Sequence, residues 1–175
     1  MGRTQYYTAA SLDGFIADPD HSLGWLFTRA REPGGPLDYP SFIAEVGAIA
    51  MGATTYEWIL DHGDWPYEQP SWVFTHRELP IVPTAAIELV QGDVAPVHAA
   101  MVEAAGDRNV WVVGGGDLAG QFADAGRLDE VLVTIAPVTL GAGAPLLPHR
   151  VELRLEDVGR NGDFVAATYA VVHGA

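Results

Sequence analysis

The chain has 175 residues with 23 acidic and 9 basic side chains, so its formal net charge is −14, and every basic residue is an arginine. Nucleic acid is therefore excluded as an expected partner, because DNA and RNA are bound through stripes of Lys and Arg that neutralise phosphates. An anionic membrane surface is disfavoured for the same reason. The sequence contains no cysteine, which excludes disulfides, thiolate catalysis and sulfur-ligated metal sites.

Hydrophobic residues make up 49 % of the chain and charged residues 18 %, which supplies enough apolar side chains for a packed core. The length predicts one domain over residues 1–175. Residues 1–10 contain one arginine and no long apolar run, so we expect no secretory signal. No apolar stretch has the length that a bilayer requires. We therefore expect a cytoplasmic protein without a membrane partner.

Short runs rich in Val, Ile, Tyr and Thr between turn residues predict strands, whereas apolar residues three and four positions apart predict helices. In chain order the pattern predicts a strand at 6–10, a strand at 48–51, a helix at 54–60, strands at 72–75 and 87–90, a helix at 94–105, a strand at 110–113, a helix through 118–125, and strands at 131–135, 153–158 and 164–172.

Asn161-Gly162, between the last two strands, is a strong hairpin signal. The segment 29–40 is rich in proline and glycine and is predicted to be a loop. The alternation of strands and helices predicts an α/β fold. Its central sheet should be mostly parallel, with an antiparallel C-terminal hairpin at one edge.

The most informative segment is Val110–Leu118, in which a strand runs through three consecutive glycines, 114–116, into a helix. Glycine lets backbone N–H groups approach an anion closely, and a helix N-terminus favours negative charge. The segment therefore predicts a phosphate cradle, with a tight turn without a ligand as the alternative. It also matches the dinucleotide fingerprint loosely at Gly114-x-Gly116-x-x-Ala119, although the nearest acids, Asp129 and Glu130, precede the following strand.

Two further strand ends carry similar chemistry. Ile49–Thr55 is a strand followed by a glycine and then by hydroxyls at a helix start, with ordinary helix capping as the alternative. Thr75-His76-Arg77 places a hydroxyl, an imidazole and a guanidinium after a strand, which suits an anion such as a 2′-phosphate; the alternative is a solvent-facing loop. Ligands of open α/β sheets bind beyond the carboxyl ends of the strands, so three such ends together predict one extended polyanionic ligand, a dinucleotide.

Four motifs occur in a fixed order along the chain. They are Thr8–Ala17 (TAASLDGFIA), Met51–Glu57 (MGATTYE), the three-glycine strand end, and Ile135–Pro148 (IAPVTLGAGAPLLP). In this combination the chain resembles the dihydrofolate-reductase-like superfamily, and specifically the C-terminal reductase domain of the bifunctional riboflavin-biosynthesis deaminase/reductase and its stand-alone relatives. The resemblance covers nearly the whole chain and implies the three-layer α/β fold of that superfamily.

The resemblance implies NADPH as the cofactor, and the positions that match the family's motifs imply its contacts. The residues expected near the nicotinamide are Ala9, Ile16 and Trp25. The residues expected near the pyrophosphate are Gly52, Ala53, Thr54, Thr55, Val113, Gly114, Gly115, Gly116, Asp117 and Leu118. The residues expected near the adenosine and its 2′-phosphate are Thr75, His76 and Arg77. The resemblance further implies a cis peptide between Gly114 and Gly115, and a homodimer in which the apolar segment Leu140–Pro148 covers a partner.

The reaction implied by the resemblance is the NADPH-dependent reduction of a small-molecule substrate, 5-amino-6-(5-phosphoribosylamino)uracil. No deaminase domain accompanies these residues, so we expect the reductase step alone. Two alternatives stay open: a pterin- or dihydrofolate-type reductase, and a nucleotide-binding protein of this fold without turnover. Two positions depart from the riboflavin enzymes, Phe15 in place of Lys or Arg and Gly114 in place of Glu, and only Arg29 and Arg31 are expected near a substrate phosphate.

The catalytic acid is unknown from the sequence. The candidate is Asp38, near the start of a helix expected within 37–46, where folate reductases carry a carboxylate; capping of that helix is the favoured interpretation. Asp13 in Ser-Leu-Asp-Gly is expected to be a turn residue. The six histidines lack metal-ligand spacing, so we expect no metal site. Surface or structural roles are expected for His62, His98 and His149.

Overall fold

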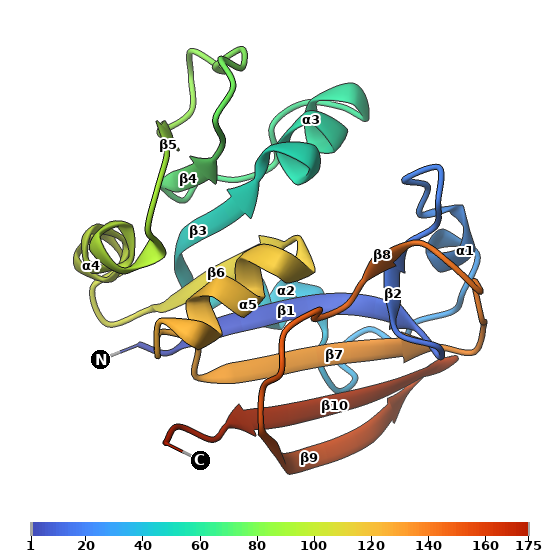
Figure 1. Cartoon of the computed structure of the whole chain (residues 1–175). Coiled ribbons are helices and arrows are strands. Elements are labelled where there is room, and N and C mark those ends of the chain that lie inside the picture. Colours follow the sequence, from blue (N-terminus) through green and yellow to red (C-terminus); the bar gives the residue numbers. More distant parts are fainter. Residues whose placement is uncertain (1, 175) are drawn as a thin grey trace.

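A computed structural model describes residues 2–174 as a central sheet with helices on both faces (Figure 1). The strands are β1 (Thr4–Ser11), β2 (Phe15–Ala17), β3 (Val46–Gly52), β4 (Ser71–Phe74), β5 (Ile87–Val90), β6 (Asn109–Gly114), β7 (Glu130–Ala136), β8 (Ala144–Pro145), β9 (Leu153–Asn161) and β10 (Phe164–Val171). The helices are α1 (Gly24–Phe27), α2 (Tyr39–Ala44), α3 (Ala53–Asp61), α4 (Val94–Ala105) and α5 (Gly116–Asp124).

The main sheet has eight strands in the order β5-β4-β3-β6-β1-β7-β10-β9. The first six run parallel, and β10 and β9 are antiparallel to their neighbours. The apolar run of β3 is buried along nearly its whole length, as expected for a central strand covered on both faces. Strand β9 is exposed along most of its length because it forms the edge of the sheet. The predicted α/β fold, with a mostly parallel sheet and an antiparallel C-terminal hairpin, is confirmed.

Two hydrophobic cores lie on opposite faces of the sheet. On one face α4 and α5 contribute Met101 and Phe122, both fully buried. On the other face α2 and α3 contribute Phe42 and Tyr56. Figure 1 shows α5 in front of the sheet and α2 behind it. Each such apolar side chain stabilises the fold by about 1.5–3 kcal/mol when it is removed from water, and the three-layer arrangement is confirmed.

A small second sheet pairs β2 with β8 next to the end of β1 (Figure 1). Asp13, in the turn between β1 and β2, accepts hydrogen bonds from Ser11 Oγ at 2.6 Å, from the Leu140 amide at 3.0 Å and from the Gly141 amide at 2.7 Å. These bonds lower the pKa of Asp13 to about 2. The turn prediction for Asp13 is confirmed, and the turn anchors the segment that leads into β8.

Every strand and helix predicted from the pattern is present within a few residues, and the bounds of β5 and α4 agree with the prediction. The pattern missed β2, α1 and β8, because two to four residues are too few for a periodic signal. The hairpin turn needs glycine at 162, where φ is 59° and a Cβ would lie 2.2 Å from the Ala30 carbonyl oxygen. Among residues 2–174, none of the helices has the length and apolar content to traverse a bilayer.

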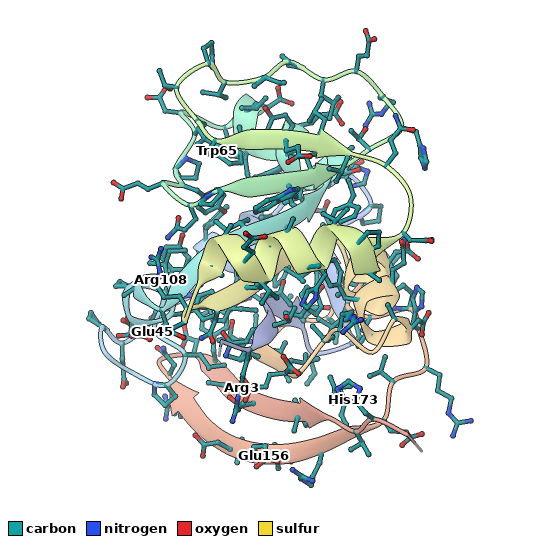
Figure 2. The ribbon with its side chains drawn as sticks, turned by 90° about the vertical axis from the view of Figure 1, so that its left-hand side faces the viewer. Arg3, Glu45, Trp65, Arg108, Glu156 and His173 are labelled. Atoms are coloured by element: carbon teal, nitrogen blue, oxygen red, sulfur yellow. The ribbon has the colours of Figure 1, made fainter. Side chains whose placement is uncertain are left out.

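The parallel strands give the molecule two distinct ends. Figure 2 is viewed from the side on which Arg3, Glu45 and Arg108 lie, and these residues directly precede β1, β3 and β6. The carboxyl ends lie on the opposite side of the molecule. All three strand-end motifs predicted from the sequence lie at those carboxyl ends, which is where an open α/β sheet binds ligands.

Candidate functional site

A cavity of about 940 Å³ crosses the carboxyl-end half of the sheet and is lined by residues of β1, β3, β4, β5, β6 and β7. From β5 to β7 the sheet order contains five inter-strand steps, which at about 4.8 Å each span on the order of 24 Å. A cavity of this length suits an extended ligand. All the cofactor-binding residues predicted from the sequence line it, except Trp25 and Arg77.

Two helix N-termini meet in the middle of this cavity. Helix α3 follows its N-cap Gly52, and α5 follows its N-cap Gly115. The first amide groups of a helix have no partner within the helix and carry its positive dipole end. The two ends are adjacent, since a Cβ built on Gly52 would lie 3.8 Å from the Gly114 carbonyl oxygen. The predicted cradle therefore has the donors that a pyrophosphate requires.

The three consecutive glycines at the end of β6 differ in their backbone conformation and in what surrounds them. Gly114 has a φ of 156°, and the predicted cis peptide between Gly114 and Gly115 is present. A Cβ on Gly116 would lie 2.3 Å from the carbonyl oxygen of Leu146 and 2.4 Å from that of Pro145. Gly116 is thus required because residues 145–146 cross directly over the start of α5.

The third strand end is only partly at the cavity. Thr75 and His76 line it, and the Arg77 amide donates to Thr75 Oγ1 at 3.0 Å. The Arg77 guanidinium instead donates two hydrogen bonds of 2.8 Å to the carboxylate of Glu57 on α3. This pairing lowers the pKa of Glu57 and raises that of Arg77. The expectation that Arg77 faces the ligand is corrected to this extent: its side chain is held by Glu57 and does not line the cavity.

At the end of the cavity where the nicotinamide is expected, Ala9 and Ile16 line the cavity and Trp25 does not. The loop after β2 presents Leu23 and Leu26 to the cavity, whereas the Trp25 indole donates to the Ser22 carbonyl at 3.1 Å. Residues three apart share a face of a helical turn, and the two residues between them face elsewhere. Leu23 and Leu26 therefore line the cavity in place of Trp25, whose contact with a cofactor stays a prediction.

The candidate acid Asp38 caps α2 and does not line the cavity. Its carboxylate accepts from the Gly34 amide at 3.2 Å and from Ser41 Oγ at 3.0 Å. These bonds lower the pKa of Asp38, the Gly34 amide most of all, so the group stays ionised at neutral pH. The capping interpretation is confirmed, and Asp38 has no geometry for donating a proton in the cavity.

Asp117 is the one carboxylate that lines the cavity within the described residues, and it contacts His149, which also contacts Asp124. His149 Nε2 lies 3.0 Å from Asp117 Oδ1, and His149 Nδ1 lies 2.8 Å from Asp124 Oδ2. Hydrogen bonding to Asp117 and then to Asp124 raises the pKa of His149, and the same contact lowers that of Asp117. The expected structural role of His149 is thus a bridge between the segment after β8 and α5.

The sequence predictions missed an aromatic compartment beside Ala9. We call it the inner chamber; it is lined by Tyr7, Arg31, Tyr39, Tyr67, Trp111 and Thr134. Thr134 is the β7 partner of Ala9 in the sheet register. Strand periodicity could have found two members, because Tyr7 and Trp111 lie two residues before the predicted Ala9 and Val113 and share their faces. Arg31, which was expected near the substrate, is in the chamber, whereas Arg29 does not line the cavity.

No three His, Asp or Glu side chains between residues 2 and 174 come close enough together to hold a metal ion. The other two histidines considered above make contacts within the fold. His98 Nε2 lies 2.7 Å from Thr4 Oγ1, and His62 Nδ1 lies 2.7 Å from the Trp58 carbonyl oxygen.

Comparisons with known proteins agree with this geometry. YwjB of Bacillus subtilis (strain 168), an uncharacterised protein, is 31 % identical over 172 residues, which cover 95 % of this chain and 97 % of YwjB. The crystal structure of a Shewanella sp. PV-4 protein assigned to riboflavin biosynthesis has a TM-score of 0.82 at 25 % identity, covering 98 % of this chain and 99 % of that one. Dihydrofolate reductase from Enterococcus faecalis, in a complex with NADP(H) and RAB-propyl, has a TM-score of 0.58 at 14 % identity, covering 97 % and 96 % of the two chains.

Residues 59–161 match the family described as the RibD C-terminal domain. The resemblance carried by the four sequence motifs is thereby confirmed. Reductases of this family typically use NAD(P)H. The chain belongs to the RibD C-terminal domain family, a family of NADPH-dependent reductases with the dihydrofolate-reductase-like fold.

Proposed function

We propose that the chain is an NADPH-dependent reductase that transfers hydride to a small planar heterocycle. The observation that carries this proposal is the single cavity that joins the strand-end motifs to the aromatic inner chamber. A dinucleotide lying along the strand ends would bring its nicotinamide to Ala9 and Ile16, beside that chamber. When bound, the reduced nicotinamide supplies the hydride, and the protein supplies alignment and a site shielded from water.

The pyrophosphate would be held mainly by backbone amides at the starts of α3 and α5. Such amides need few cations, which reconciles a polyanionic cofactor with a chain of net charge −14. Thr75 and His76 would face the adenosine. Arg77 would contact a 2′-phosphate only by exchanging Glu57 for it, so discrimination between NADPH and NADH depends on that exchange.

Three candidates remain for the reaction that follows cofactor binding. The first candidate is the family reaction, reduction of 5-amino-6-(5-phosphoribosylamino)uracil, for which Arg31 is the cation available in the inner chamber. A second candidate is nucleotide binding without turnover, which the lack of a carboxylic acid in the inner chamber favours. A pterin- or dihydrofolate-type reductase is the remaining alternative.

The test combines binding with turnover. NADPH binding is followed by calorimetry and by quenching of tryptophan fluorescence, and turnover by the absorbance of the reduced nicotinamide with the aminouracil compound, dihydrofolate and unphosphorylated heterocycles. We expect binding and oxidation of NADPH with at least one substrate. Binding without oxidation supports the second candidate, and no binding at millimolar NADPH contradicts all three candidates.

A matched pair of variants makes the test specific to the cradle. Gly52→Ala puts a methyl group between the two strand ends, 3.8 Å from the Gly114 oxygen, and should weaken NADPH binding while the fold is kept. Gly24→Ala, whose Cβ would meet only Ser22 Oγ at 3.5 Å, lies outside this cavity and should leave binding unchanged.

We further propose a homodimer, formed through the hairpin of β9 and β10. Leu155, Val158 and Val165 are 54 %, 57 % and 47 % exposed. Leu155 pairs with Tyr169 and Val158 with Ala167, which places all three exposed side chains on one face of the hairpin. The segment Leu140–Pro148, expected from the sequence to cover a partner, packs Leu146 and Leu147 against the core of its own chain, and its contact with a partner stays a prediction. Light scattering measures the oligomeric state directly.

A further inference from the structure

The inner chamber has an unusual balance of polar groups. Its residues come from distant parts of the chain but lie together: the ring centroids of Tyr7 and Tyr39 are 6.4 Å apart, and those of Tyr67 and Trp111 are 5.6 Å apart. Flat aromatic walls of this kind select planar ligands. The polar atoms among those walls then decide whether the bound ring should present hydrogen-bond donors or acceptors at its edge.

Arg31 is the only cation of the chamber, and most of its hydrogen-bonding capacity is unused. Its guanidinium carbon lies 4.0 Å from the centroid of the buried Phe164 ring, which holds the side chain in place. Its Nη2 donates one long hydrogen bond of 3.4 Å to Thr134 Oγ1. A guanidinium has five N–H donors and no acceptor. Within residues 2–174 no carboxylate pairs with Arg31, so donors remain for a ligand.

The hydroxyl groups of Tyr39 and Tyr67 are also hydrogen-bond donors. Burial raises the pKa of Tyr39 and of Tyr67, so both hydroxyls keep their protons at any physiological pH. Neither hydroxyl has a hydrogen-bond partner among the described residues. Both are therefore available to donate to a ligand oxygen.

Strong acceptors, by contrast, are missing or already used. No Asp or Glu lines the chamber in the described part of the chain. Thr134 Oγ1 accepts from Arg31, the Tyr7 carbonyl accepts from Trp111 Nε1 at 3.0 Å, and the Tyr7 hydroxyl donates to the Leu37 carbonyl at 2.9 Å. The remaining acceptors of the chamber are neutral hydroxyl oxygens, whereas its donors include a charged guanidinium. A ligand edge made of oxygen atoms would therefore gain a charge-assisted hydrogen bond that an edge made of N–H groups would not.

We infer that the inner chamber takes a planar ring that presents oxygen acceptors at its edge, as in quinones and cyclic diones, with an ionised or strongly polarised oxygen against Arg31. This inference rests on the proposed reductase function and assigns its substrate class. It disfavours aminopteridines, whose amino group and ring N–H would meet no carboxylate acceptor among the described residues of the chamber. It also leaves a substrate phosphate with at most one cation, so a phosphate should add little affinity.

Binding of two probes tests the inference without any turnover. A hydroxynaphthoquinone presents an ionised oxygen and two carbonyls, whereas a diaminopteridine presents donors; both are titrated by calorimetry, with and without NADPH. We expect the hydroxynaphthoquinone to bind at least about tenfold more tightly, as a charge-assisted hydrogen bond implies. Tighter binding of the diaminopteridine, or no binding of the hydroxynaphthoquinone at millimolar concentration, overturns the inference.

Three substitutions locate the effect. Arg31→Met keeps the packing on Phe164 and should weaken the hydroxynaphthoquinone by about tenfold or more, and Tyr67→Phe should weaken it by a few-fold. Arg154→Met is the matched control, since Arg154 pairs with Glu156 on the exposed edge strand β9. The inference would be overturned if Arg31→Met and the unchanged protein bound the hydroxynaphthoquinone with equal affinity, provided near-UV circular dichroism shows that both proteins are folded.

The outcomes also separate this inference from the proposed function. If NADPH is neither bound nor oxidised but the hydroxynaphthoquinone binds in an Arg31-dependent manner, the chamber is as inferred and the reductase proposal is wrong. If NADPH is bound and oxidised only with an aminopteridine, the reductase proposal stands and the inferred substrate class is wrong.

Discussion

Gly116 is a position where one added methyl group should damage the fold. It is the first residue of α5, and a Cβ there would lie 2.3 Å from the Leu146 carbonyl oxygen and 2.4 Å from that of Pro145. Both neighbours are backbone atoms, so no side-chain rotation can relieve the contact. The Leu146 oxygen also accepts a 2.9 Å hydrogen bond from the hydroxyl of the fully buried Tyr6.

The expected cost of Gly116→Ala follows from these contacts. Overpacking costs about 1–3 kcal/mol, and a Tyr6 hydroxyl left without its acceptor costs a further ~1–3 kcal/mol. Alanine in place of glycine within a helix returns at most about 1 kcal/mol. The net expectation is a loss of about 3 kcal/mol, within a range of about 1–5 kcal/mol.

Urea denaturation followed by tryptophan fluorescence measures this loss. Gly24→Ala is the control, because the Cβ meets only an ordinary contact at 3.5 Å and should change the free energy of unfolding by less than about 1 kcal/mol, toward stabilisation. If Gly116→Ala is as stable as the unchanged protein within about 0.5 kcal/mol, residues 145–146 do not press on the helix start, and the reasoning is refuted.

Three further predictions concern charge and assembly. Arg77→Ala should raise the dissociation constant of NADPH by roughly tenfold and that of NADH much less, as measured by calorimetry; equal losses would mean that the 2′-phosphate is held elsewhere. Because the folded-state pKa of His149 is raised above 6.5 by Asp117 and Asp124, its contribution to stability is fully present below pH 6.5 and is lost as pH rises through the folded-state pKa. Urea titrations across that pH range should therefore show a decline in the unchanged protein that His149→Gln lacks, and parallel curves would contradict the bridge. Val158→Lys should give a monomer by light scattering while the fold is kept, and an unaltered mass would place the interface on another surface.

Local signals in the sequence were enough for the order of the elements and for most of the cofactor cradle. Hydrophobic periodicity predicted the main strands and the three longest helices, because these elements bury a regular face over several residues. The strand-end motifs were recognisable because a helix start needs particular neighbours within one turn. Asp13 and Asp38 were likewise understood correctly from their neighbours alone, since a turn and a cap are both local hydrogen-bonding arrangements.

Tertiary structure decided which side chains share the cavity. Arg31 reaches Thr134 over 103 positions in the chain, and His149 reaches Asp117 over 32. No local pattern encodes such contacts, because they depend on how the sheet order brings distant strand ends together. For the same reason the sequence could place Arg77 after a strand but could not show that Glu57 on α3 holds its guanidinium. By itself the sequence determined the fold class and predicted the strand-end residues that line the cavity, whereas the inner chamber exists only where the folded chain assembles it.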